Sequence, residues 1–155
     1  MAAVLRGAED GVMTTKQHPL EVYRRFQSYL LRGEFARVGE VADMDGYTEN
    51  CVGLTGWTTG LKIALRNFQE NIASRLTDMA VTEHDVLEAG DTLVIRGTFE
   101  VTHSGEFLGV APTGRRVSFD WIDMYRVASG RIVWRYLLCD WKGLQDQLTA
   151  AIPLL

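Results

Sequence analysis

The fold of this chain is decided by residues 99–140, which read FEVTHSGEFLGVAPTGRRVSFDWIDMYRVASGRIVWRYLLCD. Within this stretch, residues 117–127 alternate with a period of two, which is typical of a β-strand that buries one face. The buried phase carries Val117, Phe119, Trp121, Asp123, Tyr125 and Val127. A carboxylate in such a row is costly to bury unless it is protonated, hydrogen-bonded or lining a cavity. We therefore predict that Asp123 is a functional residue.

The strands on either side are expected to repeat this arrangement. On residues 92–103, one phase is apolar from Leu93 onward and ends in His103. On residues 131–140, the phase that we expect to face the same way ends in Asp140. Three neighbouring strands would then each point one ionisable group toward the same side. Asp140 also precedes a predicted helix, so it is either a catalytic group at the pocket edge or a helix cap.

Seven aromatic side chains are expected to line the space in front of this face and to contact a flat, hydrophobic substrate. They are Trp57, Phe99, Phe119, Trp121, Tyr125, Trp134 and Tyr136. We expect the pocket to open where residues 53–60 and residues 104–115 meet, because both segments carry glycines beside strand ends.

Helices precede the long hairpins in this sequence. Apolar residues recur at spacings of three and four over residues 16–32 and again over residues 61–72, which predicts two amphipathic helices. The later segments read as long hairpins followed by a closing helix. This order predicts an α+β fold, a conical half-barrel in which a curved, mostly antiparallel sheet wraps around the N-terminal helices. We expect one domain over residues 16–155, preceded by a flexible arm over residues 1–15.

Composition and charge narrow the possible functions. The 155 residues carry a net charge of -4 with scattered Lys and Arg, so the basic stripe of a nucleic-acid-binding protein is missing. No apolar run approaches the ~20 residues that span a bilayer, and residues 1–15 lack the apolar core of a signal peptide. A cytoplasmic protein without membrane association is therefore expected. The three histidines have no metal-ligand spacing, and we expect Cys51 and Cys139 to be reduced and buried.

Three segments resemble the SnoaL-like polyketide cyclase family, which has a nuclear-transport-factor-2-like (NTF2-like) fold. They are HSGEFLGVAPTGR at residues 103–115, IDMYR at residues 122–126 with GRIV at residues 130–133, and Asp140 followed by Gly143-Leu144 and Gln147-Leu148. The resemblance covers most of residues 20–148. It implies that a small hydrophobic, polyketide-like substrate undergoes intramolecular aldol ring closure without a metal or an organic cofactor. By this resemblance, Asp123 matches the acid-base aspartate of the family and His103 matches the nearby histidine.

The chain departs from the family pattern in the last long strand. Relatives commonly carry GKIVEHWH, whereas residues 130–137 read GRIVWRYL, so the acidic and histidine positions are lost. We expect a more aromatic pocket wall as a result. Three functions remain open. They are a cyclase of the lyase or isomerase type, an enzyme that opens or hydrolyses epoxides with Asp123, and a non-enzymatic module that binds a hydrophobic ligand.

The opposite face of the sheet predicts a homodimer. Its phase includes Ile122, Met124 and Val133, which make that face too apolar for exposure to solvent alone. Pairing of two copies through the outer face would bury these residues.

Overall fold

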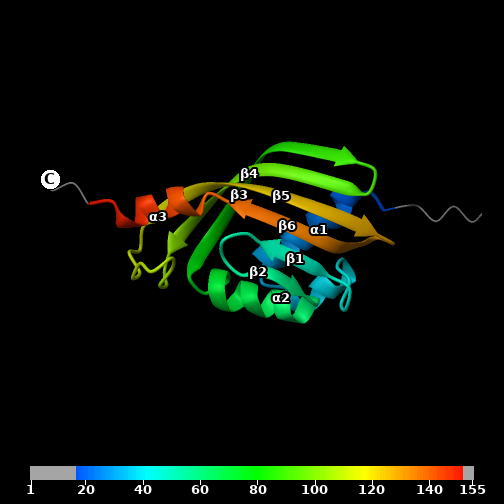
Figure 1. Cartoon of the computed structure of the whole chain (residues 1–155), viewed down its shortest axis with the longest axis horizontal. Coiled ribbons are helices and arrows are strands. Elements are labelled where there is room, and N and C mark those ends of the chain that lie inside the picture. Colours follow the sequence, from blue (N-terminus) through cyan, green and yellow to red (C-terminus); the bar gives the residue numbers. More distant parts are fainter. Residues whose placement is uncertain (1–16, 152–155) are drawn as a thin grey trace, which may run out of the picture.

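The computed structural model describes residues 17–151, so the arm predicted over residues 1–15 lies outside the described residues. A six-stranded sheet with the order β2-β1-β6-β5-β4-β3 forms the body of the molecule (Figure 1). The strands are β1 (Thr48–Cys51), β2 (Gly56–Thr59), β3 (Leu76–Ala89), β4 (Thr92–His103), β5 (Arg116–Ala128) and β6 (Arg131–Cys139). Neighbouring strands are antiparallel except β1 and β6, which are parallel. This curved, unclosed sheet with its helices confirms the predicted α+β class.

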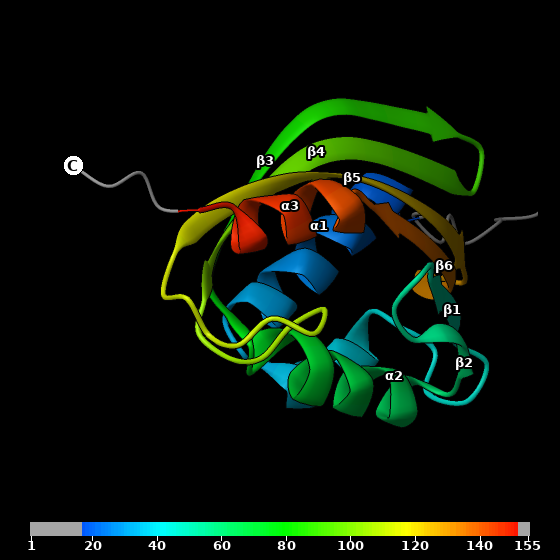
Figure 2. The ribbon, with the colours of Figure 1, turned by 60° about the vertical axis from the view of Figure 1, so that its left-hand side comes forward.

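The helices surround the hollow of the sheet, and Figure 2 shows α1 inside its curve. They are α1 (Pro19–Leu31), η1 (Phe35–Glu40), α2 (Leu61–Phe68), the π-helix η2 (Gln69–Ala73) that continues α2, and α3 (Trp141–Thr149). α1 begins at Pro19, because the fixed φ and missing N–H of proline suit the first helical turn. One stripe of α1, which includes Val22 and Phe26, is buried against the sheet. Within residues 17–151, no helix is long and apolar enough to cross a membrane.

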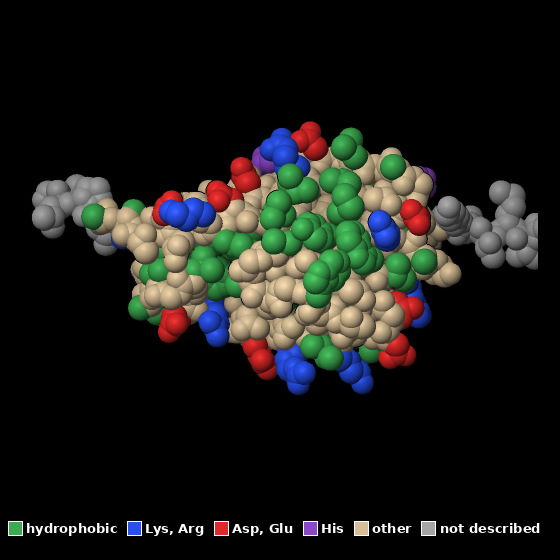
Figure 3. Space-filling model, viewed as in Figure 1, with side chains coloured by type: hydrophobic (Ala, Val, Ile, Leu, Met, Phe, Trp, Pro, Cys, Tyr) green, Lys and Arg blue, Asp and Glu red, His purple; other side chains and the backbone are tan. Residues whose placement is uncertain are grey.

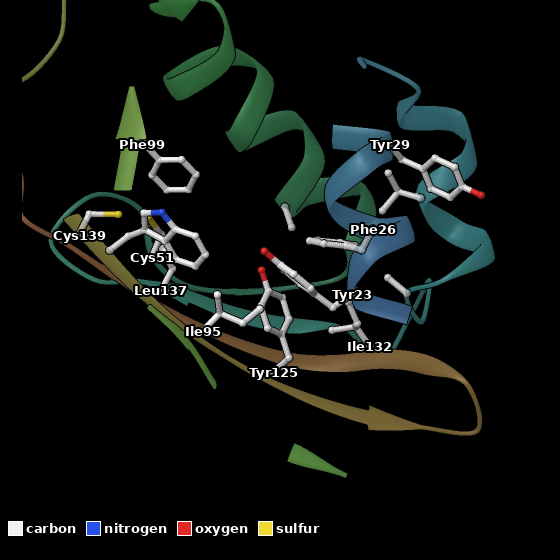
Figure 4. Packing of buried hydrophobic residues seen from close by; sticks show 14 of the residues in the cluster. Tyr23, Phe26, Tyr29, Cys51, Ile95, Phe99, Tyr125, Ile132, Leu137 and Cys139 are labelled. Atoms are coloured by element: carbon white, nitrogen blue, oxygen red, sulfur yellow. The ribbon is translucent and has the colours of Figure 1, made fainter. Parts of the chain in front are cut away.

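The core fills the space between α1 and the concave face of the sheet (Figure 4). The rings of Tyr23 and Phe26 lie 5.1 and 6.0 Å from the ring of Tyr125, measured between centroids. Cys51 and Cys139 are buried and free, which confirms their predicted state. The aromatic side chains of the helix and the sheet therefore close most of the interior of the cone.

The predicted alternation is confirmed on β4 and β5. Every second residue from Leu93 to His103 is buried, and so is every second residue from Val117 to Val127. A glycine is required at position 97, since a Cβ there would lie 2.4 Å from the Thr82 carbonyl oxygen and 2.8 Å from the Trp121 ring. The large indole can lie over the strand only because residue 97 has no side chain.

A β-bulge interrupts the alternation on β6. Arg126 of β5 pairs with Trp134, whereas the next residue, Val127, pairs with Ile132. Val133 is therefore the extra residue on β6. An extra residue shifts every following side chain to the other face of the sheet, because successive side chains of a strand point to opposite faces.

The bulge decides on which face the aromatic residues of β6 lie. Trp134 and Tyr136 stack with their ring centroids 5.9 Å apart, and both rings lie 6.3 Å from Trp57. Trp57 is 59% exposed, and the three rings form a cluster on the outer face. The prediction that these three residues line the pocket is therefore wrong. The inward positions after the bulge are instead those of Arg135, Leu137 and Cys139.

Candidate active site

Asp123 lies on the concave face of β5 with only 1% of its surface exposed. Arg135 forms a bidentate ion pair with it, because Nε donates to Oδ1 at 3.1 Å and Nη2 donates to Oδ2 at 2.7 Å. The hydroxyl of Tyr125 also donates to Oδ2, at 2.5 Å. Both carboxylate oxygens therefore have partners, which is the condition for holding a carboxylate in the interior.

A second carboxyl group, that of Glu49 on β1, lies on the other side of Arg135. β1 and β6 are parallel neighbours, and Glu49 is directly opposite Arg135 in the register. Glu49 Oε2 lies 3.6 Å from Arg135 Nη1 and accepts a hydrogen bond from the Tyr47 hydroxyl at 2.7 Å. The buried cluster thus contains two carboxyl groups, one guanidinium and two tyrosine hydroxyls.

Burial and charge oppose each other in this cluster. Burial raises the pKa of the Asp123 carboxyl above its ordinary value, and the charge of Arg135 opposes that rise. Burial is the largest single influence on the pKa of Arg135 and lowers it. Asp123, Tyr125 and Tyr47 together outweigh burial and keep the pKa of Arg135 above its ordinary value. The guanidinium lies 5.8 Å from the ring centroid of Phe26 and 5.5 Å from that of Tyr125, which adds cation–π attraction. One permanent positive charge is therefore shared by two carboxyl groups.

Strict alternation along residues 131–140 places Arg135 on the outer face, so the pattern alone does not identify it as the partner of Asp123. The composition of the strand did contain one sign that Arg135 is buried with a partner. Residues 132–139 read IVWRYLLC, and Arg135 is their only charged side chain. A long charged residue in a central, apolar strand is almost never buried without a partner.

His103 is buried at the end of β4, far from Asp123. Asp123 is opposite Ile95 in the register of β4 and β5. Residues 96–103 separate Ile95 from the position of His103, which corresponds to roughly 26 Å of extended strand at about 3.3 Å per residue. The two predicted catalytic residues share a face of the sheet, but the structure does not bring them together.

The loop that follows β4 fixes the tautomer of His103. The Thr113 N–H donates to Nδ1 at 3.2 Å, and the Thr113 hydroxyl lies 3.0 Å from the same nitrogen. Since Nδ1 accepts, the proton of the neutral ring is on Nε2. Nε2 is buried and has no hydrogen-bond partner within residues 17–151. Burial lowers the pKa of His103, so the ring is neutral at pH 7.

The free energy of unfolding is expected to fall when the pH drops below about 6.5, the ordinary pKa of histidine. The unfolded chain binds a proton at His103 there, whereas the folded chain does so only at lower pH, so the loss reaches up to about 1.4 kcal/mol per pH unit. Urea unfolding at several pH values measures this slope. His103→Gln should remove it, and His84→Gln, at an exposed histidine, should keep it. The same slope in all three proteins would contradict the assignment.

The other predicted aromatic contacts share the concave face. Phe99 stacks on Trp121 with 4.8 Å between ring centroids, and Phe119 lies 5.5 Å from Phe99. The indole Nε1 of Trp121 is buried and, among the described residues, has no hydrogen-bond partner. Trp121 and His103 therefore each hold an unused N–H donor on the inner side of the sheet.

Asp140 is exposed and precedes α3 as its N-cap residue. Its Oδ1 accepts a hydrogen bond from the Gly143 N–H at 2.9 Å. Of the two alternatives for Asp140, the geometry favours the helix cap. In the part of the chain that the structure describes, no group of three or more His, Cys, Asp or Glu is placed to hold a metal ion.

A cavity of about 400 Å³ lies where two loops meet the α2–η2 helix. It is lined by Leu54, Thr55, Asn67, Asn71, Arg75, Phe107 and Leu108. The first two residues belong to residues 53–60 and the last two to residues 104–115, so the two segments meet at a cavity. That the substrate pocket opens there stays a prediction. Neither Asp123 nor His103 lines this cavity.

Comparisons with known proteins identify the family of this chain and solved structures with the same fold. The family model described as SnoaL-like polyketide cyclase matches residues 20–148. A proposed SnoaL-like polyketide cyclase from Jannaschia sp. CCS1 is 18% identical, with a TM-score of 0.77 over 94% of this chain and 100% of that chain. IdmH from Streptomyces antibioticus, a proposed polyketide cyclase, is 26% identical, with a TM-score of 0.72 over 86% of this chain and 100% of that chain. The search of curated proteins found no match.

Proposed function

Because the chain belongs to the SnoaL-like polyketide cyclase family, we propose that it closes a ring in a polyketide or related hydrophobic intermediate by acid-base catalysis without a cofactor. The observation that carries this proposal is Asp123, a carboxyl group on the apolar concave face whose pKa is raised by burial. Aldol closure removes a proton from an acidic carbon and adds one to a carbonyl oxygen. A single carboxyl group can transfer both protons in turn when the folded substrate brings both atoms within its reach.

Residues on the concave face of the sheet have distinct roles in this proposal. Arg135 is a positioning residue, because its two hydrogen bonds fix the orientation of the Asp123 carboxylate. The unused N–H groups of Trp121 and His103 are donors for substrate carbonyl oxygens, since a buried donor without an acceptor is costly. Phe99 and Phe119 provide flat apolar surface for the chain that is being closed. Residues 104–115 act as a lid over the entrance.

A second candidate function is that of a non-enzymatic module that binds a hydrophobic ligand. One observation favours it, namely that Arg135 and Tyr125 already occupy both oxygens of Asp123. Native mass spectrometry of the purified protein would identify a retained ligand, and incubation with a linear precursor of that ligand separates the two functions. A ring-closed product of unchanged mass supports the cyclase. Recovery of the precursor, bound but unchanged, supports the binding module.

We also propose that the protein is a homodimer that pairs through the outer face of the sheet. Figure 3 shows hydrophobic side chains gathered across this face, over the strands. Ile122 and Leu138 are cross-strand neighbours there and are 44% and 47% exposed. The exposed ring of Trp57, on the edge strand β2, adds a further apolar side chain. A second copy of this chain would remove that surface from water.

Leu138→Lys is expected to convert the dimer to a monomer, because it places a charge at the centre of the proposed interface. Sedimentation at micromolar concentration should show a species of twice the 17.4 kDa chain mass for the unmodified protein and of that mass alone for the variant. Ile63→Lys on α2 is the matched control, since Ile63 is 45% exposed but lies away from the sheet. A purely monomeric unmodified protein would refute the proposed dimer.

A further inference from the structure

We propose that the cavity beside α2 and η2 binds a carboxylate at the edge of the substrate, so that the molecule recognised is a planar hydrophobic acid. The inference rests on the proposed function and names the class of substrate that the cavity selects. Its basis is the contrast between the two walls of the cavity. One wall carries Asn67, Asn71 and Arg75, and the other carries Leu54, Phe107 and Leu108, with Thr55 as its one polar side chain.

The polar row, Asn67, Asn71 and Arg75, comes from one continuous helix and the turn that follows it. Asn67 is in α2, Asn71 is in the π-helix η2, and Arg75 follows directly after the C-cap of η2. Asn67 and Asn71 are four residues apart and so lie on the same side of the helix. A π-turn is rare and is found frequently at functional sites. The helix and the turn after it therefore present two amides and a guanidinium to the same cavity.

Two members of this row have unused hydrogen-bonding capacity. Arg75 donates from Nε to the Glu70 carbonyl at 3.2 Å and from Nη1 to the Glu106 carbonyl at 3.0 Å. Within residues 17–151 it forms no ion pair, and the side chain of Asn71 forms no hydrogen bond. The backbone bonds hold the guanidinium in place, and its Nη2 N–H groups remain available. A fixed guanidinium with free donors suits a carboxylate.

The charge of the cavity is opposite to that of the whole protein. The chain has a net charge of -4, yet the described lining contains one cation, Arg75, and no Asp or Glu. An anion would therefore be attracted by Arg75 in the polar wall, and not by the net charge of the protein. A charge-assisted hydrogen bond in a partly enclosed site is stronger than a neutral one.

The loop between β4 and β5 forms most of the apolar wall. Phe107 and Val110 exchange two backbone hydrogen bonds, at 3.0 and 2.9 Å, and Gln145 Nε2 donates to the Leu108 carbonyl at 3.0 Å. Leu108 has a φ of 51°, a left-handed conformation that a leucine seldom adopts. Figure 2 shows this loop, yellow-green, on the same side of the molecule as α2. The loop thus holds apolar side chains opposite the polar row. A ligand with a flat apolar ring and a polar group at its edge would contact both walls.

The test compares two probes with the same ring, the anion 2-naphthoate and its uncharged methyl ester, by titration of their fluorescence with the purified protein. The unmodified protein should bind the carboxylate about tenfold or more tightly than the ester, the size of one hydrogen bond to a charged group. Arg75→Gln should remove that preference. Asn71→Leu should weaken binding of both probes, and it leaves the anchoring bonds of Arg75 in place. Arg66→Gln should keep the preference, because Arg66 is an exposed cation of α2 outside the cavity.

Equal affinity of the unmodified protein for the two probes would overturn the inference, and so would binding of neither. A preference that persists in an Arg75→Gln variant would also overturn it. If Arg75→Gln does not fold, Arg75→Lys gives the same test, since it keeps the charge but loses the forked geometry and should reduce the preference. None of these results depends on turnover. A protein that prefers the carboxylate but closes no ring would support this inference and refute the proposed cyclase.

Discussion

Replacement of Arg135 by methionine is expected to lower the free energy of unfolding by about 3–5 kcal/mol at neutral pH. Methionine fills similar volume, but it leaves Asp123, at 1% exposure, without the cation that pairs with it. Urea unfolding gives the loss directly. Asp123→Asn combined with Arg135→Met should recover part of it, because neither member of the pair then remains as an uncompensated buried charge. Additive losses in the double variant would show that the pair is not coupled.

The loss in Arg135→Met should shrink as the pH is lowered. Without the guanidinium, which opposes the effect of burial, the pKa of Asp123 rises further above the ordinary value of about 3.9. The folded variant then binds more protons than the unfolded chain above that pH, so its stability falls as the pH rises through this range. Unfolding curves recorded at acid and neutral pH should therefore show a smaller difference from the unmodified protein in acid.

Asp123→Asn is expected to reduce the rate of ring closure by about 10²-fold or more, the size of a general-base contribution. The substitution keeps the shape of the side chain and removes the group that titrates. It is not structurally silent, however, because the amide NH₂ would face an Arg135 donor where a carboxylate oxygen now accepts. A loss of stability is therefore expected with the loss of rate, and the two effects have to be separated.

Glu49→Gln supplies the matched control for Asp123→Asn. It also replaces a buried carboxyl group beside Arg135 with an amide, so it imposes a similar change on the guanidinium. If Asp123 alone transfers the proton, Glu49→Gln should lose stability but stay within a few-fold of the unmodified rate. Equal losses of rate in both variants would assign the effect to disruption of the cluster.

Local pattern was enough to predict the sheet and the cone. The alternation on residues 92–103 and residues 117–127 identified the buried faces of β4 and β5, including the inward positions of His103 and Asp123. It succeeded because both strands are regular over these residues and bury a single face. The glycine-containing segments that flank the cavity were likewise visible as breaks between strands.

Local pattern was not enough to predict which residues form the site. The bulge at Val133 has no strong sequence signal, and it moves Arg135 inward and Trp134 outward. The separation between His103 and Asp123 depends on the register of β4 and β5, that is, on which residues are opposite each other. The alternation of side chains predicts only the face on which each residue lies. It was therefore predictable that His103 and Asp123 face the same side of the sheet, but not whether they contact each other. One member of the polar row, Asn71, lies in a π-turn, which hydrophobic periodicity does not reveal.

The central claim is that this protein closes a ring by acid-base catalysis at Asp123. The most direct measurement is the rate at which the purified protein converts a linear polyketone, with an acidic carbon between two carbonyls, into a cyclic isomer of unchanged mass. We predict conversion well above the uncatalysed rate by the unmodified protein, and a rate about 10²-fold lower or less for folded Asp123→Asn. A folded Asp123→Asn variant that retains activity within a few-fold of the unmodified protein would contradict the account.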